Sequence, residues 1–339
     1  MSENQQPSVL VTGGAGYIGA HTCKALAKSG YRPIAFDNLS TGHRNFLRWG
    51  PFVEGDTRDA AAVKSACETH GVVAAIHFAA SALVAESVAN PAEYYQNNVS
   101  GTLGLLQGLK DADVNALVMS SSCAVYGVPE KQPIDENTVP NPINPYGASK
   151  LMAERILSDY GKAYGLRWSA LRYFNACGAD LEAEIGELRT RETHLIPRVM
   201  MWIQGHLDSI SVFGADYPTL DGTAVRDYIH VCDLADAHLL ALKRLLNREQ
   251  DGVLNLGTGR GYSVKQVLTE IERITGFKVT AAIGARRPGD PPTLIANPER
   301  AKQRLGFSTS RSDLETIIRT AWAWHQKAHP RSQAKQPRA

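Results

Sequence analysis

A short apolar run followed by a glycine-rich turn constrains the fold of this chain more than any other feature. Val9-Leu10-Val11 precedes Thr12-Gly13-Gly14-Ala15-Gly16-Tyr17-Ile18-Gly19, and a helical pattern from Ala20 to Ser29 ends at Gly30. Glycine permits strained backbone angles, so backbone N–H groups can approach a pyrophosphate at the positive end of the helix. The strand, turn and helix predict a dinucleotide-binding unit with glycines spaced three apart, at Gly13, Gly16 and Gly19.

The acidic residue after the second strand indicates which dinucleotide binds. Pro33 to Phe36 is a β-like run, and Asp37 follows it directly. Its carboxylate can accept hydrogen bonds from the adenosine ribose hydroxyls, whereas the 2′-phosphate of NADP would be repelled. NAD is therefore the predicted cofactor, although His43 and Arg44 leave NADP as a minor alternative. Asp56, after a third strand, fits an adenine contact or a helix N-cap.

Strands and helices alternate through the first half of the chain. Further β-like runs are Val72 to Phe78, Ala116 to Ser120 and Trp168 to Leu171, with helical stretches between them. This order predicts an α/β fold, a Rossmann-type doubly wound parallel sheet with right-handed crossovers. We expect residues 8–175 to form mainly an NAD-binding domain.

The pattern loosens after about Asn175, where proline and glycine become frequent. Residues 176–328 predict a smaller, mixed α/β C-terminal domain, from which about 226–260 return to the first domain. Val253 to Leu256 is a strand candidate there, and Asp233 to Leu246 and Val264 to Thr275 are helix candidates. Residues 1–7 and 330–339 are polar and aperiodic, so flexible tails are expected.

Two capping boxes are expected in this second half. Ser263 with Gln266, and Ser312 with Glu315, have the spacing at which a hydroxyl and a later side chain satisfy first-turn amides. They predict helices that start near Val264 and Asp313.

Composition excludes several classes of partner. The net charge of +2 comes from 36 basic and 34 acidic residues that are interspersed, so neither nucleic acid nor an anionic membrane is an expected partner. No apolar run is long enough to span a bilayer, and Met1 to Ser8 does not resemble a secretory signal, which favours the cytoplasm. The five cysteines are scattered without zinc-type spacing, so free thiols and no metal are expected.

A tyrosine and a lysine four residues apart provide a candidate reaction centre. Pro145 tolerates the first position of a helix, and that helix would place Tyr146 and Lys150 on one face. A nearby ammonium lowers the pKa of a phenol, which would make Tyr146 an acid/base near neutral pH. The alternative is an ordinary surface pair, because this spacing is common by chance.

These motifs occur in the order found in a known family. With the glycine turn, Asp37, Ser120-Ser121-Ser122-Cys123-Ala124-Val125-Tyr126-Gly127 and the Tyr146/Lys150 pair, the chain resembles the extended short-chain dehydrogenases/reductases. Within that family it is similar to the UDP-glucose 4-epimerases, from about Val9 to Trp324. The blocks that carry this similarity are His77 to Ala80, Tyr94 to Val99, Arg172 to Asn175, Val225 to Val231 and Arg287 to Asp290.

The resemblance implies NAD-dependent epimerisation at C4 of a UDP-hexose. UDP-glucose and UDP-galactose would interconvert through a 4-keto sugar in a cytoplasmic homodimer of galactose metabolism, with NAD tightly retained and the C-terminal domain over the UDP-sugar. Tyr146 would take the proton of the 4-hydroxyl, Ser122 would hydrogen-bond that oxygen, and Lys150 would hold the nicotinamide ribose.

The same resemblance implies two sets of binding residues. Cofactor contacts are expected at Gly13, Gly16, Tyr17, Ile18, Gly19, Asp37, Asn38, Asp56, Thr57, Phe78, Ala79, Ala80, Asn97, Tyr146 and Lys150. Substrate contacts are expected at Ser122, Phe174, Asn175, His194, Leu195, Phe213, Arg226, Arg287, Asp290 and Leu294. Structural alternatives exist for three of them: Asn175 as a turn cap, Phe213 as a core residue, and Arg226 in an ion pair with Asp227.

Three positions depart from the family pattern. Ala82 stands where many members have a lysine near the cofactor pyrophosphate, and His194 stands where an asparagine often contacts the substrate diphosphate. Leu294 replaces a tyrosine that in some members excludes N-acetylated sugars. A 4-epimerase of UDP-N-acetylhexosamine or UDP-pentose is therefore an alternative.

Two further activities compete less well. A sugar-nucleotide 4,6-dehydratase needs extra acid/base groups after the active-site hydroxyl, where this chain has Cys123 and Ala124. A non-catalytic NAD-binding regulator would not need Ser122, Tyr146 and Lys150 together.

Overall fold

The computed structural model describes residues 6–287 and 290–330. The predicted flexible tails fall largely on residues 1–5 and 331–339, which lie outside the described residues, as do Pro288 and Gly289 of the Arg287 to Asp290 block.

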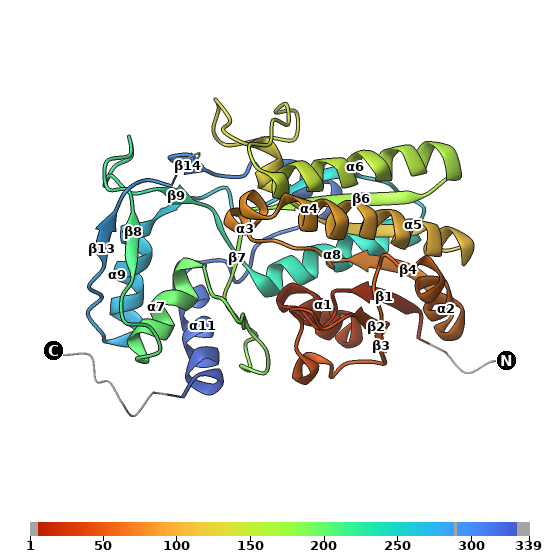
Figure 1. Cartoon of the computed structure of the whole chain (residues 1–339), viewed down its shortest axis with the longest axis horizontal. Coiled ribbons are helices and arrows are strands. Elements are labelled where there is room, and N and C mark those ends of the chain that lie inside the picture. The colour runs from red at the N-terminus through yellow and green to blue at the C-terminus, as the bar shows by residue number, and fades with distance from the viewer. Residues whose placement is uncertain (1–5, 288–289, 331–339) are drawn as a thin grey trace.

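A seven-stranded parallel sheet forms the larger part of the molecule (Figure 1). The strand order β3-β2-β1-β4-β5-β6-β11 reverses direction next to β1, as expected for a doubly wound sheet. The predicted Rossmann-type fold is confirmed. The strands are β1 (Ser8–Thr12), β2 (Arg32–Asp37), β3 (Phe52–Glu54), β4 (Val72–His77), β5 (Ala116–Ser122), β6 (Arg167–Tyr173) and β11 (Gly252–Leu256).

Alternate residues of each strand serve two different cores, one on each face of the sheet. In β1, Val9 and Val11 pack into one core and Leu10 into the other, which explains why the strand is apolar throughout. One face is covered by α1 (Tyr17–Lys28), α8 (Val231–Leu246) and α10 (Glu299–Leu305). The opposite face is covered by α2 (Ala60–His70), α5 (Gly101–Asp111) and α6 (Pro145–Tyr164).

Short helices connect these layers near the ends of the strands. A π-helical turn, η2 (Tyr95–Ser100), precedes α5 and contacts α6, which contains Tyr146 and Lys150. Such turns are rare in proteins, and those that occur are often found at functional sites. The other short elements are η1 (Arg44–Phe46), α3 (Val84–Ala89), α4 (Pro91–Tyr94) and η3 (Cys123–Tyr126).

The second half of the chain builds a smaller body beside the sheet. Its core lies mainly between α7 (Leu195–Ile203), α9 (Val264–Thr275) and α11 (Leu314–Ala328). Three small sheets pair β10 with β7, β9 with both β12 and β14, and β13 with β8. These strands are β7 (Asn175–Cys177), β8 (Ser211–Phe213), β9 (Val225–Arg226), β10 (Tyr228–His230), β12 (Tyr262–Ser263), β13 (Ala282–Gly284) and β14 (Thr293–Leu294).

Local predictions succeeded at one capping box and failed at the other. Ser263 and Gln266 form both reciprocal hydrogen bonds, and α9 begins at Val264. The predicted box at Ser312 is wrong: Asp313 caps α11 by accepting from Thr316 N at 2.8 Å. Ser312 is instead held by Asp233, to which its hydroxyl donates at 2.6 Å, so it faces α8 rather than its own helix. Among the described helices, none has the length and apolar character needed to cross a membrane.

Candidate active site

The glycine-rich turn joins β1 to α1 in a conformation that leaves no room for side chains at two of its glycines. Gly13 has a φ of +70°, and a Cβ there would lie 2.7 Å from Ala79 N. A Cβ on Gly19 would lie 2.1 Å from Gly13 O. The close backbone packing leaves the N-terminal amides of α1 beside a turn without side chains, which fits the pyrophosphate of a dinucleotide.

Asp37 ends β2 and lies against this turn. Its carboxylate accepts hydrogen bonds from Ala15 N at 3.0 Å and Leu39 N at 2.8 Å. Burial raises the pKa of Asp37, and these two N–H groups oppose that rise. The carboxylate is thus fixed where the second strand ends, the position expected for an acceptor of ribose hydroxyls.

Asp56 does not cap a helix, because α2 is capped by Asp59, which accepts from Ala62 N at 3.0 Å. The carboxylate of Asp56 instead accepts from Asn38 Nδ2 at 3.1 Å and from Arg58 Nη2 at 2.6 Å. Arg58 lowers the pKa of Asp56 to about 2. Asn38 and Asp56 therefore lie together at the ends of β2 and β3, and Thr57 is buried beside them.

The opposite side of the turn is formed by residues that follow β4. Ala79 lies against Gly13, and the ring of Phe78 is 4.6 Å from that of His238 on α8. Asn97, in the π-helical turn, donates to Ser81 Oγ at 3.0 Å. The structure thus brings residues of the predicted cofactor set together around the C-terminal ends of β1, β2 and β4. Tyr17 donates to Gly178 O at 2.7 Å and connects this side to the second half of the chain.

The predicted reaction centre is assembled from β5 and α6. Asn144 caps α6 by accepting from Gly147 N at 2.9 Å, and Pro145 is the first helical residue as predicted. Lys150 donates from Nζ to Ser120 O at 2.9 Å. Ser122 ends β5 and hydrogen-bonds with Tyr146. Tyr146 and Lys150 are therefore not a surface pair, since Lys150 is buried.

The titration of this centre differs from the prediction. Burial raises the pKa of Tyr146 to about 12, and the hydrogen bond with Ser122 only opposes this rise. Burial also lowers the pKa of Lys150 to about 8. The expectation that Lys150 lowers the pKa of Tyr146 in this structure is wrong, because Lys150 points its ammonium at the Ser120 carbonyl and burial dominates at the phenol.

Arg226 and Asp290 form the centre of the predicted substrate site. Arg226 donates from Nη2 to Asp290 Oδ1 at 2.5 Å and to Pro291 O at 2.8 Å. The alternative ion pair with Asp227 is wrong, because that buried carboxylate accepts instead from the backbone of Thr258, Gly259 and Ala296. Leu294 pairs with Arg226 across β14 and β9, so both line the same small sheet.

An exposed aromatic ring and an arginine stack next to this sheet. The guanidinium of Arg287 lies 4.4 Å from the ring centroid of Phe213, whose side chain is 41% exposed. Phe213 is therefore not a core residue, and one ring face is available to a planar base. Phe174, in contrast, is buried, and Asn175 begins β7 and donates from its backbone N to Asp227 O at 3.0 Å.

His194 caps α7 just before Leu195 and belongs to a charged cluster that the sequence reasoning missed. Its Nδ1 donates to Glu187 Oε1 at 2.6 Å, and the same oxygen accepts from Arg189 Nε at 2.8 Å. The Glu187 charge raises the pKa of His194. A signal was present in the alternating charges of Glu187, Arg189, Glu192 and His194, but the motif comparison singled out only His194.

Two acidic groups could suggest a metal, but each already holds a cation from the chain. Lys24 Nζ binds Asp180, Glu182 and Glu184 at 2.7, 2.5 and 2.6 Å. Glu187, in the group with Glu192 and His194, binds Arg189.

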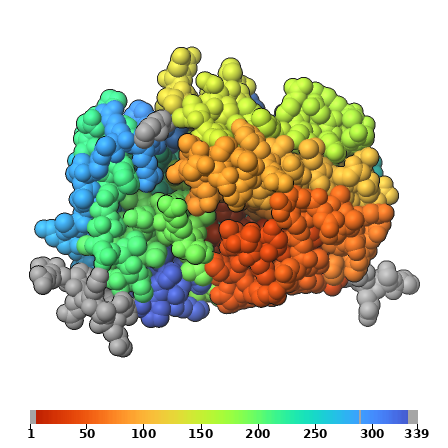
Figure 2. Space-filling view, in the orientation of Figure 1, coloured from red at the N-terminus to blue at the C-terminus, as the bar shows by residue number. Residues whose placement is uncertain are grey.

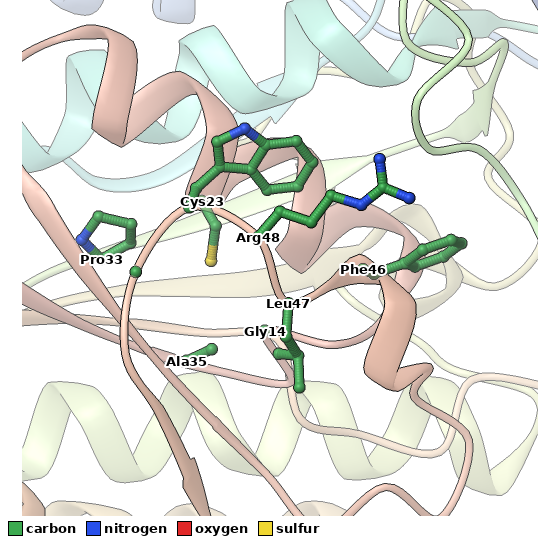
Figure 3. Close-up of a pocket in the computed structure, with 9 residues that line it drawn as sticks. Gly14, Cys23, Pro33, Ala35, Phe46, Leu47 and Arg48 are labelled. Atoms are coloured by element: carbon green, nitrogen blue, oxygen red, sulfur yellow. The ribbon is translucent and has the colours of Figure 1, made fainter.

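Figure 2 shows a hollow where the red and orange surface of the first half meets the green surface of the second. A separate small pocket lies behind the glycine-rich turn, between α1, β2 and the residues after η1 (Figure 3). It is too small for a nucleotide, and its Cys23 thiol is buried, which raises the thiol pKa to about 12. This pocket is therefore not the candidate site, whose residues lie at the C-terminal ends of β1, β2, β4 and β5.

Comparison with known proteins gives consistent matches. The sequence model of the NAD dependent epimerase/dehydratase family matches residues 9–257. A UDP-glucose 4-epimerase of Rhizobium leguminosarum bv. trifolii is 50% identical over 322 residues, covering 95% of this chain and 98% of that protein. The crystal structure of UDP-glucose 4-epimerase from Brucella ovis in complex with NAD has a TM-score of 0.92 and 55% identity, covering 94% of this chain and 98% of that one. The Bifidobacterium longum enzyme in complex with NAD+ and UDP has a TM-score of 0.89 and 38% identity, covering 96% and 99%.

Proposed function

Since the chain belongs to the NAD dependent epimerase/dehydratase family, we propose that it is an isomerase that inverts C4 of a UDP-hexose. It uses NAD and interconverts UDP-glucose and UDP-galactose through a 4-keto sugar. The observation that carries this conclusion is that Ser122, at the end of β5, meets Tyr146 and Lys150 of α6, within a chain similar to named 4-epimerases along nearly its whole length.

Each residue of the proposed reaction centre has its own role in the reaction. Bound NAD supplies the acceptor and donor of the C4 hydrogen. Tyr146 takes the proton of the 4-hydroxyl and later returns it, while Ser122 holds the oxygen. A phenol whose pKa is raised to about 12 by burial is protonated at neutral pH, so it needs a nearby positive charge to act as a base. In the structure the charge of Arg189 opposes the rise in the Tyr146 pKa. Lys150, one helical turn along the same face, is assigned to holding the nicotinamide ribose.

Arg226, Arg287, Phe213 and Asp290 form the proposed UDP site. Guanidinium groups suit a diphosphate because they donate paired, charge-assisted hydrogen bonds. Phe213 offers an exposed ring face for uracil, and Asp290 is the proposed acceptor for a ribose hydroxyl. We assign mainly NAD binding to residues 8–175 and mainly UDP-sugar binding to residues 176–328.

The dehydratase alternative fits the site poorly. Burial raises the pKa of the Cys123 thiol, which follows Ser122, to about 12, and Ala124 has no proton to transfer. Elimination of water across C5 and C6 would therefore lack an acid/base pair at this position. The UDP-N-acetylhexosamine and UDP-pentose alternatives require the same chemistry and differ from the proposed activity only in the sugar that the pocket accepts. Leu294 bears on that choice, because its side chain is smaller than the tyrosine that it replaces.

We further propose a cytoplasmic homodimer that acts in galactose metabolism. Support for the dimer comes from exposed apolar side chains on neighbouring helices of one face: Val84 and Val88 on α3, Leu103 on α5 and Met152 on α6. Their exposed fractions range from 41% to 64%, which is costly in water unless a second copy covers them.

A substrate panel tests the proposed function. Purified protein is given UDP-glucose, UDP-galactose, their N-acetyl forms, UDP-xylose and UDP-arabinose, with saturating NAD. We expect the highest kcat/KM for the UDP-glucose and UDP-galactose pair. A preference for an N-acetylated sugar or a pentose would favour that alternative, and no turnover of any of them would refute the assignment.

A further inference from the structure

One buried carboxylate holds two cations at the edge of the site. The Glu187 side chain is 6% exposed, and its Oε1 accepts from both Arg189 Nε at 2.8 Å and His194 Nδ1 at 2.6 Å. The two cations are more open, with side chains 29% and 45% exposed. Burial opposes ionisation of Glu187, but the charges of His194 and Arg189 outweigh it and lower its pKa to about 2. The carboxylate therefore orients both cations.

The loop that contains this cluster is fixed on two sides. Trp324 on α11 donates from Nε1 to Glu187 O at 2.9 Å, and its ring packs against Gly186. His43, which follows the cofactor-side strand β2, donates from Nε2 to Leu188 O at 2.9 Å. Because these contacts hold the backbone carbonyls of Glu187 and Leu188, the backbone that leads into Arg189 is fixed between the two halves of the molecule.

Arg189 lies next to the glycine-rich turn, because His43, which holds the carbonyl of the preceding Leu188, also donates from its backbone N to Ala15 O in that turn at 2.9 Å. The charge of Arg189 opposes the burial that raises the pKa of Tyr146, and it acts in the same way on Tyr17, the first residue of α1. The N-terminus of α7 follows His194 directly and adds a positive dipole end. The second carboxylate, Glu192, uses Oε1 to accept from the N–H groups of Thr193 and His194.

The guanidinium of Arg189 also has N–H groups that its contact with Glu187 does not use. Within residues 6–287 and 290–330, its side-chain hydrogen bonding is from Nε to Glu187 alone, which leaves both terminal amino groups for a ligand. A guanidinium oriented through Nε presents those groups as a planar pair, the geometry that matches two phosphate oxygens.

We propose that Arg189 is a further binding residue that contacts the diphosphate of a bound nucleotide, beside His194. The inference rests on the proposed function, since the diphosphate belongs either to the UDP-sugar or to NAD. Glu187 is the positioning residue that holds Arg189 and His194 in place for it.

Arg189→Gln tests this contact, with Arg191→Gln as the matched control. Arg191 has the same charge two residues along and an exposed side chain. KM for UDP-glucose, kcat and the NAD content of the purified protein are measured for the wild type and both variants. Loss of a charge-assisted contact should raise KM by about tenfold or more in Arg189→Gln. Arg191→Gln should change KM by less than about twofold, because its charge is solvated.

The two sources of diphosphate give different results. A raised KM with NAD retained assigns Arg189 to the UDP-sugar, and a lower NAD content with unchanged KM assigns it to the cofactor. If neither quantity changes, or if Arg191→Gln changes them equally, the proposal is wrong. Arg189→Lys, which keeps the charge but lacks the planar fork, should give an intermediate effect and guards against a folding defect in Arg189→Gln. Wild-type turnover of UDP-glucose is measured in parallel, so failure of this inference is distinguishable from failure of the proposed function.

Discussion

The proton of Tyr146 is controlled by opposing influences on a single side chain. Burial disfavours the phenolate, whereas the hydrogen bond with Ser122 and the Arg189 charge favour it. Lys150 is tied to the Ser120 carbonyl, and its low pKa of about 8 shows that burial also disfavours its charge. The reaction centre is thus a set of groups whose charged forms need a partner, as expected where catalysis requires shifted pKa values.

Replacing Tyr146 by phenylalanine should remove the transferable proton and leave the packing of the ring. Because a positioned acid/base contributes about 10²- to 10⁴-fold, kcat for UDP-glucose should fall by at least about 100-fold while NAD is retained. Tyr160→Phe, on the same helix about four turns away, is the control and should keep near-wild-type kcat. Near-normal turnover in Tyr146→Phe would refute the assigned role.

At the scale of single residues, the sequence predicted which residues belong to the site better than it predicted the residues that they contact. Asp37 was found because it follows a predicted strand, and Tyr146 and Lys150 because they share a face of a helix predicted to start at Pro145. Ser122 was found through the resemblance to the family. The partner of Arg226 was not predictable, since Asp290 lies 64 positions away and the nearer Asp227 looked equally suitable. Glu187 and Arg189 were missed because their relation to Tyr146 depends on how the loop before α7 folds back onto the sheet.

Helix α6 is fixed by a buried ion pair one turn beyond Lys150. Glu154 accepts from Arg172 Nε at 2.8 Å and Nη2 at 2.5 Å, and from Ser121 Oγ at 2.5 Å. Both charged side chains are 5% exposed. The pair joins α6 to β5 and β6 beside Ser122, and the Glu154 charge opposes the burial that lowers the pKa of Lys150. It therefore holds the catalytic helix in register with the strand that carries Ser122.

Removing one partner of this pair should be costly. Glu154→Gln leaves the Arg172 charge buried without a carboxylate, so the free energy of unfolding should drop by about 3–5 kcal/mol. Arg155→Ala on the same helix breaks only an exposed pair with Asp159 and should cost less than about 1 kcal/mol. Urea unfolding of the two variants measures the difference. Equal losses would show that the buried pair does not hold α6.

Elements were predicted well where the pattern was long and poorly where a cap depended on tertiary contacts. The alternating strands of the first half, and α9 with its capping box, follow from local sequence. The cap of α11 did not, because Ser312 bonds to Asp233 on α8, and no local pattern records that contact. The last two residues of β5 were also missed, so Ser122 was not placed at the end of a strand.

The whole molecule concentrates its chemistry at the C-terminal ends of the parallel strands, next to the smaller body. This edge is where doubly wound sheets bind ligands, at the point where the strand order reverses.

Five buried histidines pack around the sheet and its neighbours, and burial lowers the pKa of each: His21, His77, His230, His238 and His325.

Those histidines should make stability depend on pH. Their pKa values in the folded protein are about 3 to 4, below the ordinary value of 6.5, so the unfolded chain binds more protons between about pH 4 and 6.5. The free energy of unfolding should therefore decrease as the pH falls through this window. Asp227, whose pKa burial raises to about 6, acts in the opposite direction, as do Asp37, Glu192 and His194, whose pKa values are also raised, but these groups are fewer. Urea midpoints at pH 7.5 and pH 5 test this, and an unchanged or higher midpoint at pH 5 would contradict it.

The fate of the hydrogen on C4 tests the central claim most directly. UDP-glucose deuterated at C4 is incubated with the enzyme in ordinary water, and the UDP-galactose formed is examined by NMR. Because the hydrogen leaves C4 and returns to it inside the site without contact with water, the product should keep its deuterium at C4. Replacement of that deuterium by hydrogen from the solvent would contradict the account.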